Sequence, residues 1–72
     1  MRTEYELFLR EVKKQIAVRN LTQLEVAHRI RTHRETLSQY LSGRTAMRAQ
    51  TAFELARILG ISLDKIVEEA QK

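Results

Sequence analysis

The chain has 72 residues, with 13 lysines and arginines against 9 acidic residues and a formal net charge of +4. It contains no cysteine, which excludes disulfides and thiol-based metal or redox sites. Proline is also absent and only two glycines occur, a composition typical of helices joined by short turns. No apolar run approaches the length of a transmembrane helix, so we expect a small cytoplasmic domain without a membrane anchor or signal peptide.

The positive charge is concentrated in the middle of the chain. Residues 29–48 contain five arginines and one acidic residue, a net of +4, whereas residues 1–28 have a net of +1 and residues 49–72 a net of −1. The planar guanidinium of arginine can bind phosphate oxygens or the edge of guanine through two hydrogen bonds at once. The segment therefore favours a nucleic-acid partner, although a solvated loop flanked by arginines would have the same charge.

Apolar residues at helical spacing predict a first helix over residues 4–19. Its inner side consists of Tyr5, Phe8, Leu9, Val12 and Ile16. The following stretch, NLTQLEV, predicts the start of a second helix that runs to about residue 30. Thr22 and Glu25 have the spacing of a capping box there, and Leu21 and Val26 that of a hydrophobic staple.

A third helix is expected within residues 31–43, where Gly43 suits the left-handed residue that ends many helices. A fourth is expected over residues 49–59 with Gly60 as its stop, and a fifth after the cap residue Ser62. No alternating pattern is long enough for a strand. The predicted fold is all-α: a compact five-helix bundle that forms a single domain over residues 1–72.

Only about three residues separate the second and third helices. Two helices joined so closely form either a helical hairpin or a helix-turn-helix. Ala27 is small enough for a close crossing of the pair, and the third helix displays a polar ridge of Arg34, Glu35, Ser38 and Gln39. A polar ridge on a short helix flanked by arginines is what reading of the DNA major groove requires. We therefore predict a helix-turn-helix over about residues 23–42.

Three stretches fall in register with a known family. LTQLEVAHRI is similar to the second helix of the Cro/repressor-type (XRE-type) helix-turn-helix regulators, HRETLSQYLSGR to their recognition helix, and TAFELARILGISLDKI to their fourth and fifth helices. The chain resembles this family over nearly its whole length. The resemblance implies the lambda repressor-like fold and sequence-specific binding of double-stranded DNA, usually as a dimer on a two-fold operator.

The resemblance also implies which residues contact DNA. Gln23 would contact a phosphate at the start of the second helix, and Arg34, Glu35, Ser38 and Gln39 would contact bases. Ser42, Arg44 and Arg48 would follow the DNA backbone after the recognition helix. For His33, at the start of that helix, a phosphate or base-edge contact and an ordinary solvated turn residue are both open.

The turn departs from the usual pattern of the family, which has glycine, an apolar residue and then a serine or threonine cap. Here the residues are Arg31, Thr32 and His33. A non-glycine residue in left-handed geometry costs ~1–2 kcal/mol, so this turn is either strained or of another shape. Thr32 and Glu35 form a second candidate capping box, which would begin the third helix one residue early. The Glu35 side chain would then bind the cap and would not be available to contact cytosine. Arg48 stands where a small polar cap of the fourth helix is expected.

The sequence indicates no catalytic or metal site. His28 and His33 lie five residues apart, which does not place them on one helical face, and no cysteine or carboxylate completes a ligand set. No nucleophile–base pair, glycine-rich phosphate loop or paired-carboxylate cleft is visible. We expect neither enzymatic activity nor a cofactor.

Two function classes stay open because Phe53 and Ile58 fall off the inner stripe of the fourth helix. They either fill gaps against the first and fifth helices or form an apolar interface for a protein partner. In size the chain resembles small phage Cro-like and modulator-of-repression proteins, and other small members of the family are antitoxins. The first class is therefore a homodimeric DNA-binding regulator of a phage or mobile-element switch. The second is a protein-binding modulator, an anti-repressor or antitoxin in a hetero-complex with a repressor or toxin.

Overall fold

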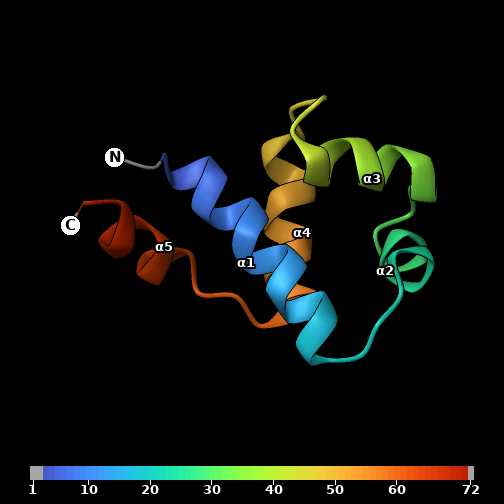
Figure 1. The fold of residues 1–72 in the computed structure, drawn as a ribbon, viewed down its shortest axis with the longest axis horizontal. Coiled ribbons are helices and arrows are strands. Elements are labelled where there is room, and N and C mark those ends of the chain that lie inside the picture. The colour runs from blue at the N-terminus through green and yellow to red at the C-terminus, as the bar shows by residue number, and fades with distance from the viewer. Residues whose placement is uncertain (1–2, 72) are drawn as a thin grey trace.

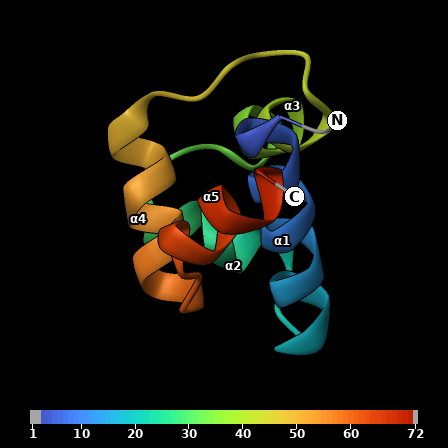
Figure 2. The ribbon, with the colours of Figure 1, turned by 90° about the vertical axis from the view of Figure 1, so that its left-hand side faces the viewer.

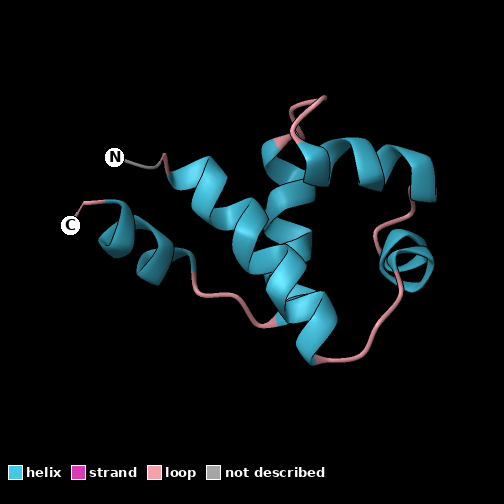
Figure 3. Cartoon of the chain, in the orientation of Figure 1, coloured by secondary structure: helices cyan, strands magenta, loops and turns pink. Residues whose placement is uncertain are grey.

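The computed structural model describes residues 3–71, which form five α-helices (Figure 1). The helices are α1 (Glu4–Val18), α2 (Gln23–Arg29), α3 (Arg34–Ser42), α4 (Ala49–Leu59) and α5 (Leu63–Ala70). Short loops join them, and no strand occurs among the described residues (Figure 3). The predicted all-α five-helix bundle is confirmed.

Helix α1 is the centre of the arrangement. It packs against α5 and also against α4 and α3, whereas α2 packs against α3. As a result α2 and α3 lie at one end of the molecule and α5 at the other, with α1 and α4 between them (Figure 1). Seen from the side, the loop between α3 and α4 arches over the top of the helices (Figure 2). None of the described helices is both long and apolar enough to cross a membrane.

The core draws side chains from all five helices. Its largest completely buried side chains are Leu37, Leu55, Leu59, Val12 and Val26. Burial of each such side chain stabilises the fold by about 1.5–3 kcal/mol. Ala27 is fully buried as well, in the pair of helices α2 and α3 whose close crossing the sequence predicts.

Two residues of α1 differ from the sequence prediction. Leu7 lies outside the predicted inner stripe yet is buried, whereas Tyr5, predicted to point inward, is 36% exposed. The hydroxyl of Tyr5 accepts a hydrogen bond from the backbone N–H of Met47 at 3.1 Å. Because a tyrosine keeps its polar tip where a partner or water is available, this residue lies at the edge of the core rather than within it.

Side chains close the beginnings of two helices as predicted. The hydroxyl of Thr22 accepts from the N–H of Glu25 at 3.1 Å, and the Glu25 carboxylate accepts from the N–H of Thr22 at 3.2 Å, so the capping box is complete. The Ser62 hydroxyl accepts from the N–H of Lys65 at the start of α5. Caps of this kind stabilise a protein by about 0.5–2 kcal/mol each.

Four helix ends share one backbone geometry. The residue that follows the last helical positions has a positive φ, and these residues are Asn20 (57°), Arg31 (58°), Gly43 (83°) and Gly60 (66°). The next residue then donates its N–H back into the helix; the pairs are Leu21 to Ile16, Thr32 to Ala27, Arg44 to Gln39 and Ile61 to Ala56. This ending favours glycine at the left-handed position. The predicted stops at Gly43 and Gly60 are confirmed, and Arg31 takes the same conformation without being glycine.

Candidate nucleic-acid interface

The turn between α2 and α3 is strained rather than altered in shape. Arg31 is left-handed, with φ 58°. The N–H of Thr32 donates to the carbonyl of Ala27 at 2.9 Å, and the N–H of Arg31 to the carbonyl of His28 at 3.2 Å. These bonds close α2 as they would around a glycine. An arginine at this position costs ~1–2 kcal/mol of strain, within the turn that sets the direction of α3.

Helix α3 begins at Arg34 with His33 as its N-cap residue. The second candidate capping box, between Thr32 and Glu35, would begin the helix one residue earlier and is not formed. Within residues 3–71, no side chain caps this helix start. The carboxylate of Glu35 is therefore not held at the cap, and both Glu35 and His33 are exposed.

A surface groove joins the start of α2 to the exposed side of α3. It is lined by Thr22, Gln23, Leu24, Arg34, Glu35 and Ser38. Gln23, the residue that the resemblance assigns to phosphate, thus shares one hollow with three of the four residues assigned to bases. The turn between the two helices produces this arrangement, because it folds α3 back beside the start of α2.

A second hollow continues from this groove around the turn. Its lining consists of Leu24, His28, Arg31, Thr32, His33, Arg34 and Glu35. His28 and His33 thus line the same hollow, although their spacing in the sequence does not place them on one helical face. Among residues 3–71, no group of three or more His, Asp or Glu side chains could hold a metal ion.

Sequence reasoning missed Leu24 and Arg31 as parts of this surface. Leu24 is 50% exposed and lines both hollows. The signal for it was present, since Leu24 does not share the inner side of α2 with Val26 and Ala27. A single exposed leucine is common on protein surfaces, but this one adds an apolar patch between the polar candidate residues.

Gln39 and Ser42 lie further along α3 and make local hydrogen bonds. The Ser42 hydroxyl donates to the carbonyl of Gln39 at 3.1 Å. The side-chain oxygen of Gln39 accepts from the Thr45 hydroxyl at 3.5 Å, which is beyond the usual length of such a bond. The weak contact leaves the Gln39 amide largely available to other partners, whereas the Ser42 hydroxyl has its hydrogen engaged and only its oxygen lone pairs available.

The loop between α3 and α4 carries Arg44 and Arg48. The N–H groups of Arg44 and Thr45 both donate to the carbonyl of Gln39, at 3.0 and 3.3 Å, which folds the start of the loop back onto α3. Arg48 is the N-cap residue of α4, and in the described chain its side chain makes no cap bond. Both arginines are exposed, as are the other three arginines of residues 29–48. The segment therefore carries its positive charge at the surface.

The two apolar residues that are candidates for a protein interface differ in their burial. Ile58 is half-buried and packs against the core, which fits the alternative that it fills a gap. Phe53 is 60% exposed, so that alternative does not fit Phe53. The reason is its place on α4, where Leu55, Ala56 and Leu59 are the buried residues and Phe53 lies on another side of the helix.

Comparison with models of protein families matches residues 12–66 to the helix-turn-helix family. The match covers most of the chain and includes α2, the turn and α3. The chain belongs to the Cro/repressor-type (XRE-type) helix-turn-helix family and is a DNA-binding regulator of this type. A search of curated proteins and a search of solved structures gave no match.

Proposed function

We propose that the chain is a sequence-specific transcriptional regulator of a phage or mobile-element genetic switch, with residues 1–72 acting as one DNA-binding domain. The observation that carries this proposal is the groove that unites Gln23 with Arg34, Glu35 and Ser38. With α3 in the major groove, these side chains face base edges and the adjacent backbone together. The context of a phage switch rests on the resemblance to Cro-like regulators.

Base recognition and backbone contact belong to different residues in this proposal. Arg34 suits the two acceptors on guanine, Gln39 the acceptor and donor on adenine, and Glu35 the amino group of cytosine, while Ser38 suits either kind of base edge. The phosphate contacts belong to Gln23, His33, Ser42, Arg44 and Arg48. Such contacts fix the register of the protein on DNA without reading its sequence.

We further propose that the regulator binds a two-fold site as a homodimer. Two copies of α3 must then lie about 34 Å apart, one turn of DNA. Phe53, exposed on α4, is the candidate for the self-interface. An aromatic side chain is well suited to this place, because it buries a large apolar area on association.

The same residue favours a second candidate function. An aromatic side chain that is 60% exposed could instead bind a different protein, and the chain would then be a modulator, an anti-repressor or an antitoxin. In that case the hetero-complex uses Phe53, and DNA contact by α3 is secondary.

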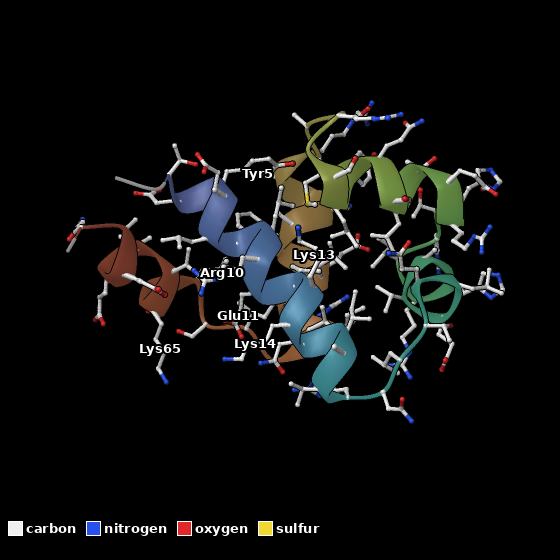
Figure 4. The ribbon with its side chains drawn as sticks, in the orientation of Figure 1. Tyr5, Arg10, Glu11, Lys13, Lys14 and Lys65 are labelled. Atoms are coloured by element: carbon white, nitrogen blue, oxygen red, sulfur yellow. The ribbon has the colours of Figure 1, made fainter. Side chains whose placement is uncertain are left out.

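Salt dependence of DNA binding tests the regulator function. Because exposed arginines of residues 29–48 displace counterions, affinity for duplex DNA should fall steeply as salt rises. Arg44→Ala should reduce the log–log slope by about 1 on any sequence. Lys65→Ala is the matched control, because Lys65 lies on α5 at the opposite end of the molecule (Figure 4), and should leave the slope unchanged. A chain without affinity at low salt would contradict the regulator function.

Sedimentation of a Phe53→Ser variant separates the two functions. If the regulator function is right, the parent chain self-associates, and the variant stays folded but loses both self-association and affinity for a two-fold site. If the modulator function is right, the parent is monomeric and Phe53→Ser leaves DNA affinity unchanged. Arg57→Ser, one turn further along α4 and also exposed, is the control for a general effect of changing this surface.

A further inference from the structure

Tyr5 lies outside the matched segment 12–66 and nevertheless contacts the loop that carries two of the candidate arginines. Its hydroxyl accepts the hydrogen bond from the N–H of Met47 at 3.1 Å, across 42 positions of the chain. The side chain of Tyr5 leaves α1 toward the segment in front of α4 (Figure 4). An N-terminal residue is thus tied directly to the loop between α3 and α4.

The two halves of this loop are held in different ways. Gly43, Arg44 and Thr45 are tied to α3 by backbone bonds to Tyr40 and Gln39. The second half is held at Met47, whose side chain is buried in the core and whose N–H is bound by Tyr5. Met47 directly precedes Arg48, the N-cap residue of α4. The position of Met47 therefore determines where the backbone of Arg48 lies.

We propose that Tyr5 is a positioning residue for DNA binding. By holding the N–H of Met47, its hydroxyl orders the loop in front of α4 and presents Arg48 to the DNA backbone before DNA arrives. A loop that is already ordered loses less entropy on binding, so the complex is tighter. This inference rests on the proposed function, which assigns Arg48 to the phosphates.

The hydroxyl of Tyr5, rather than its ring, is the group that holds the loop at Met47. Tyr5→Phe would keep the ring, which lies at the edge of the core with the residue 36% exposed, and would remove only the group that binds the N–H of Met47, a residue whose side chain is buried. An N–H in such a place that loses its partner either stays unsatisfied or shifts toward water. Loss of the hydroxyl should therefore loosen the loop at Met47 while the five helices remain.

The test compares Tyr5→Phe with the parent chain on a duplex of random sequence, well below the melting temperature of both. The variant keeps the ring and removes only the hydroxyl. Its affinity should be weaker by about three- to tenfold, the effect of one hydrogen bond. Ser62→Ala is the control: it removes the cap of α5 and lowers stability to a similar degree, but it leaves the loop intact and should bind DNA as the parent does.

A double variant tests whether Tyr5 acts through Arg48. If it does, Tyr5→Phe should weaken binding less in an Arg48→Ala background than in the parent, because the two changes then affect one contact. Amide exchange should also be faster at Met47 in Tyr5→Phe.

A Tyr5→Phe chain that unfolds, or that melts earlier and yet binds DNA as tightly as the parent, would overturn the proposal, because the hydroxyl would then serve the fold alone. Strictly independent effects of Tyr5→Phe and Arg48→Ala would overturn the route through Arg48. A parent chain without affinity for the duplex would overturn the proposed function itself, so the two failures are distinguished by the behaviour of the parent.

Discussion

The backbone N–H of Thr32 donates to the carbonyl oxygen of Ala27 at 2.9 Å, and Arg31, the residue before Thr32, has a φ of 58°. This bond ends α2 and turns the chain toward α3. Because Ala27 is also buried in the core, packing and backbone geometry act on the same joint. The orientation of α3 therefore depends on a small side chain at Ala27 and on a strained conformation at Arg31.

Arg31→Gly should stabilise the protein. Glycine adopts the left-handed conformation without the ~1–2 kcal/mol that a side chain costs there, although its greater freedom in the unfolded chain offsets part of this gain. We expect a net gain of about 1 kcal/mol in the free energy of unfolding, measured by urea denaturation. Asn20→Gly is the control and should gain less, because asparagine tolerates this conformation better. A less stable Arg31→Gly variant would show that the arginine side chain stabilises the turn by more free energy than its left-handed backbone costs.

Ala27→Leu should destabilise the protein by about 1–3 kcal/mol, since the larger side chain overpacks a position that is fully buried between helices. Ala17→Leu, an equal change at an exposed position of α1, should lie within about 0.5 kcal/mol of the parent. Thermal melts of both variants measure the difference. Equal melting temperatures would mean that α2 and α3 do not pack closely at Ala27.

The two glycines allow a paired prediction. Both have positive φ, so alanine at either position is strained. An added Cβ meets nothing within 4 Å at Gly43, but at Gly60 it lies 2.8 Å from the Nη2 atom of Arg19. That atom is the far end of a flexible and exposed side chain, which can move aside at little cost, so Gly60→Ala and Gly43→Ala should cost about the same unfolding free energy.

Arg19→Ala removes the guanidinium and should leave the cost of Gly60→Ala nearly unchanged, because a side chain that can move aside adds little coupling. Chemical denaturation of the single and double variants measures this coupling. A marked excess cost at Gly60 that disappears without the guanidinium would contradict this and show that the Arg19 side chain is held in place.

The features that the sequence predicts best depend on neighbours along the chain. The capping box of Thr22 and Glu25 and the helix stops at Gly43 and Gly60 are each determined by a few adjacent residues. The bond between Tyr5 and Met47 is different, because its partners are 42 positions apart. Periodicity likewise placed Phe53 and Ile58 together off the inner stripe, but the packing of the other helices decides that only Ile58 is covered.

In the candidate site, too, some features follow from local sequence and others only from the folded structure. The resemblance names its residues, but the start of α3 could not be chosen from sequence, since Thr32 and His33 both stand at possible cap positions. The structure explains why His33, and not Thr32, is the N-cap residue of α3. The N–H of Thr32 is used to close α2, so Thr32 belongs to the turn and the next residue, His33, stands at the N-cap position of α3 without a side-chain cap bond. The groove around Gln23 and Ser38 follows from that turn and is not visible in any local pattern.

The central claim is that α3 reads bases while the loop after it contacts the DNA phosphates. Comparing two variants on two DNAs tests this claim most directly. Binding is measured on a site selected from a random library and on a duplex of random sequence. Gln39→Ala should lose ~1–3 kcal/mol on the selected site and little on the random duplex, because only base contacts discriminate between sequences. Arg44→Ala should weaken binding to both DNAs alike. If Gln39→Ala weakens both equally, or neither, α3 does not read the site through Gln39 and the account is contradicted.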